Sequence, residues 1–176
     1  AISTQAVTIH AAPIVLEGSE TVGRDPAFIA PRGLEGRVKF WVNVFSKWGK
    51  QQSAFHHRDY PQVVFSVLDF SREAESISAI ALDRFKERAK KIEEARLMAI
   101  FKRLAQGSRA QTAAEQEIVS RMSFIPGGTR KYQDVVKEKL VRSQTGIREK
   151  YIDAVKRSGR YLPVLERIFR EYDLPV

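Results

Sequence analysis

Few side chains in this sequence have the type and spacing that chemistry requires, and the clearest candidates are two adjacent histidines. His56 and His57 lie in a stretch expected to be a strand, where neighbouring side chains point to opposite faces, so they cannot bind one metal ion together. We interpret them as partly buried histidines paired with a backbone group or with Asp59. The pair Glu75–Ser76 lies near the start of a predicted charged helix, where a carboxylate suits the positive end of the helix dipole. The sequence therefore predicts no catalytic residue, cofactor or metal site within the chain.

A glycine pair, Gly127–Gly128, is followed by Thr129, Arg130 and Lys131, and such a turn could cradle a phosphate group. The spacing of a Walker motif is absent, however, and no strand is expected before the turn. We therefore interpret the glycines as a connector that opens the next helix.

The composition limits the class of protein. The chain has 176 residues, of which 43% are hydrophobic, enough for one ordinary domain or two small ones with a real core. It has no Cys, which excludes disulfides, thiolate metal sites and Cys nucleophiles. No apolar run approaches the roughly 20 residues that a membrane-spanning helix needs, so no transmembrane segment is predicted.

The net charge of +9, from 30 Lys and Arg against 21 Asp and Glu, predicts attraction to a polyanion. Nucleic acid is one candidate, and bacterial cell wall, whose peptide stems carry free carboxylates, is another. Residues 84–94 mix both signs, which is typical of a solvated helix face.

The first 70 residues are expected to hold an extended arm and then strands. Residues 1–36 contain too many Pro and Gly residues for a continuous helix or strand, and they are predicted to form an arm with a short strand at 6–9 or a helical turn near 25–30. Apolar residues alternate from 37 to 70, which predicts a three-stranded antiparallel meander with strands at 40–45, 54–58 and 62–68.

Residues 71–176 are predicted to be helical, which makes the chain α+β and mainly α. Ser71 is expected to cap a helix over 72–106, and Thr112 and Glu115 form a capping-box pattern for another. The apolar stripe predicted for the long helix consists of Ile77, Ala81, Leu82, Phe85, Ala89, Ile92, Ala95, Leu97, Ala99, Phe101 and Leu104.

The final segment is predicted to be a helical hairpin. Thr145 is a plausible cap for its first helix, which Ser158 and Gly159 end. Pro163 suits the first turn of the second helix, and Pro175 marks its end. Each helix has one apolar face.

The pattern of this segment is specific. Its distinctive residues are Arg142, Gln144, Thr145, Gly146, Arg157, Ser158, Gly159, Arg160, Tyr161, Leu162, Pro163, Leu174 and Pro175. Together they resemble the segment that precedes the lysozyme-like catalytic domain in the D-type membrane-bound lytic murein transglycosylases. Residues 37–69 resemble the same family more weakly, through Phe40–Trp41, His57 and the Val-Leu-Asp sequence at 67–69.

The resemblance implies a function in cell-wall turnover. Such enzymes cleave the β-1,4 bond between N-acetylmuramic acid and N-acetylglucosamine without water and yield a 1,6-anhydro sugar, with one Glu acting first as acid and then as base. In the family this Glu lies in a Glu-Ser pair beyond the closing Leu-Pro, so Glu75–Ser76 is in the wrong place. The chain is then expected to be a non-catalytic, periplasmic N-terminal portion, inactive alone and exported after removal of a signal peptide.

The partners implied by the resemblance are the catalytic half of the same protein and peptidoglycan glycan strands. The chain would scaffold the catalytic domain or extend its glycan groove. The residues predicted to lie at the junction, or on a glycan, are Arg142, Gln144, Arg157, Arg160 and Tyr161.

A basic helical module that binds nucleic acid is the alternative, suggested by a sequence pI of about 9.9. The interleaved Glu residues and the lack of a helix-turn-helix or RNA-recognition signature count against it, so nucleic acid is not the expected partner.

Overall fold

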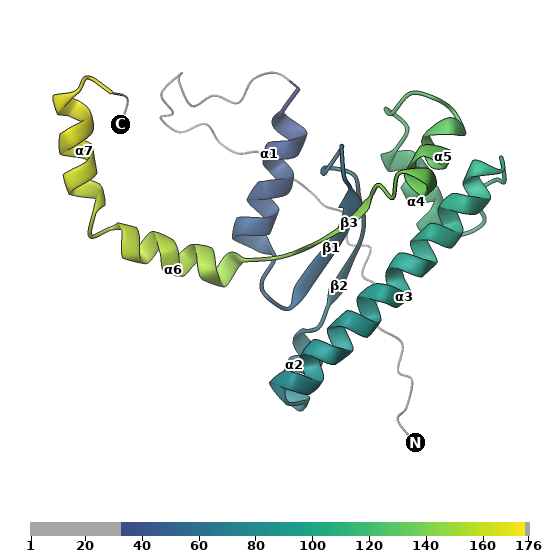
Figure 1. Ribbon diagram of the computed structural model, residues 1–176, viewed down its shortest axis with the longest axis horizontal. Helices are drawn as coiled ribbons and strands as arrows, with labels where there is room; N and C mark the ends of the chain where they lie inside the picture. The colour runs from purple at the N-terminus through teal and green to yellow at the C-terminus, as the bar shows by residue number, and fades with distance from the viewer. Residues whose placement is uncertain (1–32, 175–176) are drawn as a thin grey trace.

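A three-stranded antiparallel sheet lies at the centre of the computed structural model, which describes residues 33–174 (Figure 1). β1 (Gln52–His57) is the middle strand, with β2 (Val64–Asp69) on one side and β3 (Val141–Thr145) on the other. Both pairings are antiparallel, and a register shift after Phe55 marks a bulge. The predicted class, α+β and mainly α, is confirmed, as are two of the predicted strands. The structural expectations for residues 6–9 and 25–30 lie outside the described residues.

The third predicted strand, at 40–45, is wrong. These residues belong to the helix α1 (Glu35–Val42) and to the π-helix η2 (Asn43–Lys47) that continues it. Phe40 and Val44, four residues apart, are both buried against Ala54 and Val64 of the sheet. A short apolar run fits a strand and a helix equally well by periodicity, and packing on the sheet decides in favour of the helix.

The actual third strand, β3, comes from the segment expected to lead into the C-terminal helices. Thr145 is therefore a strand residue and not a helix cap, and its Oγ1 lies 3.1 Å from Ser53 Oγ, 92 residues away in sequence. The strand is short and largely polar, so it lacks the apolar alternation from which a strand can be predicted. The sheet thus joins the predicted strand region, 37–70, to the predicted helical region, 71–176.

The long predicted helix is divided into α2 (Ser71–Ser76) and α3 (Ala79–Ala105). Ile77 breaks it with an extended backbone, and the Oγ of Ser78, not that of Ser71, caps α3 by accepting the N–H of Ala81. Residues of α3 such as Leu97 and Phe101 are completely buried in the main core with Phe55 and Phe65 of the sheet.

The buried face of α3 differs from the predicted stripe because it includes a carboxylate. Glu93 is buried, and it accepts hydrogen bonds from Ser66 Oγ on β2 at 2.5 Å and from Arg96 at 2.7 Å through both carboxylate oxygens. The predicted stripe residues Ile77, Ala81, Ile92, Ala95 and Ala99 are exposed instead. The stripe residues Leu82, Ala89, Leu97, Phe101 and Leu104 are buried as predicted, and Glu93 takes a core position that hydropathy does not select.

Two further helices complete the main core, α4 (Ala113–Arg121) and α5 (Arg130–Lys137). The predicted capping box is confirmed, since Thr112 Oγ1 accepts the N–H of Glu115 and the Glu115 carboxylate accepts the N–H of Thr112. An ion pair from Arg103 to Glu115 ties α4 to α3. The helix predicted after the glycine pair is also confirmed, and α5 packs along α3.

The two predicted C-terminal helices are present as α6 (Arg148–Ser158) and α7 (Leu162–Glu171). Figure 1 shows α7 rising away from α6 rather than lying back along it, so the predicted hairpin is open. Every residue from 159 to 174 is exposed. None of the helices between residues 33 and 174 is long and apolar enough to cross a bilayer.

The junction between β3 and α6 depends on a glycine. A Cβ at Gly146 would overlap the backbone carbonyl of Trp48, whereas a Cβ at Gly159 would meet nothing closer than Lys156 O at 3.6 Å. We expect Gly146→Ala to lower the free energy of unfolding by about 1–3 kcal/mol, because the overlapped atoms belong to the backbone and must shift. Gly159→Ala, at a helical φ of −54°, should change it by less than about 0.5 kcal/mol.

Urea denaturation of the two variants measures both values. Equal stability of Gly146→Ala and the unsubstituted protein would show that the close approach does not constrain this junction.

Candidate functional site

The five residues predicted at a junction lie in two separate places. Arg142 and Gln144 are on β3, where Arg142 donates to the Lys139 carbonyl at 3.1 Å and Gln144 donates to the Thr145 carbonyl at 2.8 Å. Arg157 is near the end of α6, and Arg160 and Tyr161 are in the turn before α7; all three are exposed. The structure therefore does not unite the five in one cluster, and it leaves the last three on the open C-terminal helices.

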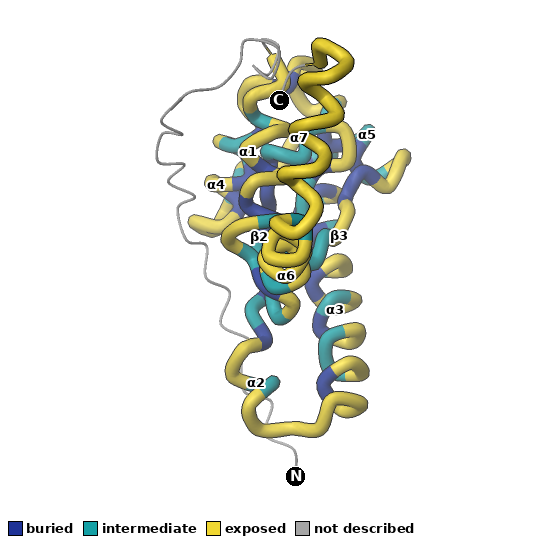
Figure 2. Tube along the Cα trace, turned by 90° about the vertical axis from the view of Figure 1, so that its left-hand side faces the viewer, coloured by how far each residue is buried: buried dark blue, intermediate teal, exposed yellow. Residues whose placement is uncertain are grey.

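Exposed apolar side chains gather on these C-terminal helices. Figure 2 shows α6 and α7 exposed along nearly their whole length. We call this set the C-terminal apolar face: Tyr151, Ile152, Val155, Tyr161, Leu162, Val164, Leu165, Ile168, Phe169, Tyr172 and Leu174. Large contiguous apolar surfaces are rare on monomeric proteins and are typical of interfaces. The face is therefore the main candidate for docking a partner.

The first turn of α6 is held firmly by the π-helix and by the turn that follows it. Backbone N–H groups of Ile147 and Arg148 donate to the carbonyls of Val44 and Trp48, at 3.0 and 3.1 Å. The carboxylate of Glu149 accepts the N–H of Lys50 at 2.9 Å. Hydrogen bonds from its own N–H and from that of Lys50, with the charge of Arg148, hold the pKa of Glu149 below its usual value. These contacts fix the direction in which α6 leaves the sheet.

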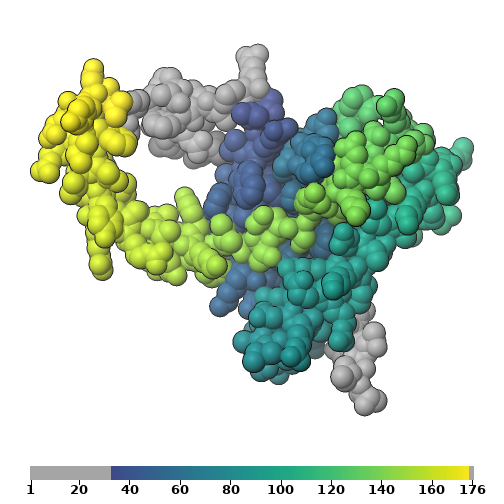
Figure 3. Space-filling view, viewed as in Figure 1, coloured from purple at the N-terminus to yellow at the C-terminus, as the bar shows by residue number. Residues whose placement is uncertain are grey.

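Aromatic side chains extend the C-terminal apolar face onto α1. The ring of Tyr151 lies 5.3 Å from that of Phe45 on η2, and Phe45 lies 6.0 Å from Trp41 on α1. Trp41 and its neighbours Val38 and Val42 are exposed. Figure 3 shows open space between α1 and α7, with α6 joining the two sides. The apolar side chains of α1 and α6 are thus connected by ring contacts.

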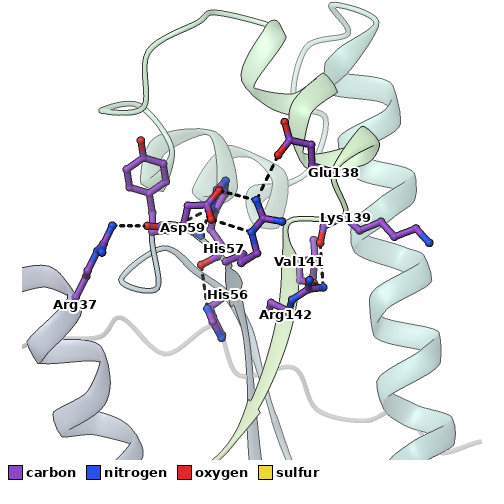
Figure 4. Close-up of polar contacts among 10 residues, drawn as sticks. Arg37, His56, His57, Asp59, Glu138, Lys139, Val141 and Arg142 are labelled. Carbon is purple, nitrogen blue, oxygen red and sulfur yellow. Dashed lines mark hydrogen bonds and ion pairs between the residues drawn. The ribbon is translucent and has the colours of Figure 1, made fainter.

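A second surface lies at the opposite end of β1, in the turn that leads to β2 (Figure 4). Arg58 pairs with Asp59 at 2.8 Å and with Glu138 at 3.3 Å, and Arg37 donates to the Asp59 carbonyl at 3.0 Å. The hydrogen bond from Arg58, with the positive charges around it, lowers the pKa of the Asp59 carboxyl. With the neighbouring rings of Tyr60 and Phe124, described next, these four charged residues form what we call the β1–β2 corner.

Two rings adjoin the charged groups of the corner. Tyr60 is half-buried and packs edge-to-face on His57 at 5.1 Å and on Phe124 at 5.7 Å. Phe124, in the loop between α4 and α5, is 56% exposed. The corner thus combines an open aromatic ring with exposed donors and acceptors.

A buried imidazole holds the turn that carries the corner. His57 is only 3% exposed, and its Nδ1 accepts the backbone N–H groups of Asp59 and Tyr60 at 3.1 and 3.3 Å. An imidazole nitrogen that accepts two N–H groups carries no proton, so the ring is neutral. His56 places its Nδ1 3.0 Å from the His57 carbonyl and its ring on Phe40, on the other face of the sheet. The interpretation of both as histidines paired with the backbone is confirmed.

The loop that carries Phe124 is held by a lysine. The Nζ of Lys131 donates to the carbonyls of Met122 and Ile125, at 2.8 and 3.2 Å. Its ammonium group, which the sequence places where a phosphate could be bound, is therefore engaged with the protein backbone. Among residues 33–174, no group of three or more His, Asp or Glu side chains is arranged to hold a metal ion.

The other candidate, Glu75–Ser76, lies at the end of the short helix α2. Ser76 Oγ donates to the carbonyls of Arg72 and Glu73, at 3.2 and 3.3 Å, and both members of the pair are exposed. Glu75 is thus at the last turn of α2 and not in the first turn of a long helix as predicted. An exposed carboxyl at a helix end lacks the enclosing cleft in which a catalytic acid meets its substrate.

Comparison of the chain with protein-family models, with curated proteins and with solved structures finds no match. Function is therefore inferred from the residues themselves and from the two surfaces. Sequence reasoning identified one residue of the C-terminal apolar face, Tyr161, and two arginines beside it, Arg157 and Arg160. It missed the β1–β2 corner, because residues 37, 58, 124 and 138 converge only in the fold.

The buried histidines predict how stability depends on pH. Burial disfavours the imidazolium form, so the pKa of His57, raised only partly by Asp59, and that of His56 both lie below the usual 6.5. Below about pH 6.5 these two histidines bind protons more readily in the unfolded chain than in the folded protein. The free energy of unfolding is therefore expected to be fully retained above this pH and to fall as the pH drops toward the folded pKa values.

Urea denaturation between pH 7.5 and 5.5 checks this on the protein and on the double variant His56→Gln/His57→Gln. The double variant should show a flatter dependence whatever its absolute stability. Identical slopes would mean that other groups cause the pH dependence.

Proposed function

We propose that this chain is the non-catalytic portion of a periplasmic peptidoglycan lytic transglycosylase, and that its C-terminal apolar face docks the lysozyme-like catalytic domain. One observation carries the proposal: the segment whose residues resemble the family's lead-in to that domain has its apolar side chains exposed. The resemblance names a partner, and the exposed face gives that partner a surface to bury.

The energetics favour docking. Complete burial of one large apolar side chain contributes about 1.5–3 kcal/mol, and the face offers several on two adjacent helices. The contacts that fix α6 to η2 reduce the conformational entropy that docking would otherwise remove. An apolar face whose α6 part is held in place matches a constitutive contact between two parts of one enzyme better than a transient encounter.

The polar residues predicted at the junction suit the rim of this interface. Arg157 and Arg160 are exposed beside apolar side chains of α6 and α7, where a guanidinium group can form paired hydrogen bonds with a carboxylate of the partner. Tyr161, which is 65% exposed, offers a ring for packing on the partner or on a sugar. Arg142 and Gln144 hydrogen-bond within the β3 region, so we assign them to positioning the strand.

The chemistry in this proposal belongs to the partner. Its catalytic Glu would protonate the glycosidic oxygen and then remove the proton of the sugar hydroxyl that closes the 1,6-anhydro ring. The residues of this chain would hold that domain in place or guide the glycan strand toward it.

The nucleic-acid alternative has less support. The exposed face of α3 mixes signs, as in Arg84, Glu87, Arg88, Lys91 and Glu94, and Lys90 pairs with Glu87 at 3.3 Å. A strip that binds a phosphate backbone would present one sign.

The direct test is to incubate purified peptidoglycan with the 176-residue chain and with a longer form that carries the catalytic domain. Mass spectrometry for 1,6-anhydro muropeptides is expected to detect product only from the longer form. Product from the short chain would overturn the assignment of this portion as non-catalytic.

A substitution tests the docking face itself in the longer form. Ile168→Glu places a charge in the middle of the face, and we expect the rate of product formation to fall about tenfold or more as the two parts uncouple. Ile80→Glu, at an equally apolar but isolated exposed position on α3, is the matched control and should leave the rate within about twofold. Equal rates for both variants would contradict docking at this face.

A further inference from the structure

The β1–β2 corner has the chemistry of a carbohydrate site. Its two guanidinium groups, Arg37 and Arg58, are balanced by two carboxylates, Asp59 and Glu138, so the formal charges cancel. An anion would be repelled by the carboxylates and a cation by the guanidinium groups. A sugar hydroxyl both donates and accepts, and it can therefore use both kinds of group.

The aromatic pair supplies the other half of such a site. The exposed ring of Phe124 makes a T-shaped contact with Tyr60, with an angle of 84° between the ring planes, so Tyr60 covers at most one of its two faces. The slightly positive C–H groups on the flat side of a pyranose ring pack on the negative face of an aromatic ring. An exposed ring beside balanced donors and acceptors therefore fits a neutral sugar.

Hydrogen bonds between side chains and backbone groups hold both loops that form the corner. His57 holds the turn of Asp59 and Tyr60, and Lys131 holds the loop of Phe124, each through two hydrogen bonds to backbone groups. Such support costs conformational freedom, and it lowers the entropy that a ligand must remove on binding.

Two neighbouring cations add positive charge near the corner but are directed elsewhere. Arg142 is engaged with the carbonyl of Lys139, and Figure 4 shows the Lys139 side chain pointing away from Asp59.

We propose that the β1–β2 corner binds a β-1,4-linked N-acetylhexosamine chain, with a sugar ring on Phe124 and its hydroxyl groups on Arg58 and Asp59. The choice of peptidoglycan glycan as the source rests on the proposed function, whereas the ligand class rests on the corner itself. The corner then acts as a glycan-holding subsite remote from the C-terminal apolar face.

The test uses the 176-residue chain and a neutral probe, tetra-N-acetylchitotetraose, in a titration followed by NMR of backbone amides. We expect the amide signals of residues 58–60 and 123–125 to shift on saturation. Phe124→Ala should raise Kd about tenfold, and Arg58→Ala should raise it as well. Ile92→Ala, which removes a 64% exposed apolar side chain from α3, is the matched control and should leave Kd within about twofold.

Three results would contradict sugar binding at the corner. The amide signals could fail to shift at millimolar probe, or the shifts could be confined to α6 and α7. A duplex DNA could also shift the same amides more strongly than the sugar does. Thermal melting of each variant verifies folding, and Arg58→Ala keeps the test decisive if Phe124→Ala fails to fold.

The failure of this site and that of the proposed function are distinguishable. Sugar binding at the corner without any effect of Ile168→Glu would retain the site and reject the docking face. A loss of activity in Ile168→Glu without sugar binding at the corner would retain the docking face and reject the site.

Discussion

The pairing of β3 with β1 is the constraint on which the rest of the structure depends. A five-residue strand returns to the sheet after about seventy residues of helix and loop (70–140), and it pairs with the middle strand as the third strand. The backbone then passes so close to Trp48 that only Gly146 fits, and α6 begins at once. The direction of α6 is therefore set by backbone contacts with Val44 of η2 and with Trp48.

This arrangement separates two surfaces of different chemistry. The C-terminal apolar face lies beyond one end of β3 and gains stability only when a partner buries it. The β1–β2 corner lies near the other end of β3, where charge balance and aromatic rings favour a sugar. In the proposed transglycosylase the sheet would keep a glycan-holding site and a docking surface at a fixed separation, because β1 and β3 form part of a continuous hydrogen-bonded unit.

Buried polar groups explain much of how the helices are attached. Glu93 joins α3 to β2 through Ser66, Glu115 joins α4 to α3 through Arg103, and His57 holds the turn after β1. Glu93 and Glu115 have partners on other elements, so each favours one packing arrangement, whereas His57 bonds to backbone groups two and three residues further on. Because these groups are polar, hydropathy does not place them in the core, and the predicted stripe of α3 therefore lacked Glu93.

Local signals in the sequence determined the fold class, two of the three strands, the capping box of α4, the helix after the glycine pair and the two C-terminal helices, since each depends on residues a few positions apart. They also identified an apolar face on each C-terminal helix. Only the tertiary structure decided that residues 40–45 are helical and that Val141–Thr145 is a strand. It also decided that Arg37, Arg58, Phe124 and Glu138 form one corner. Those outcomes depend on contacts between segments far apart along the chain, whose free energy no local pattern contains.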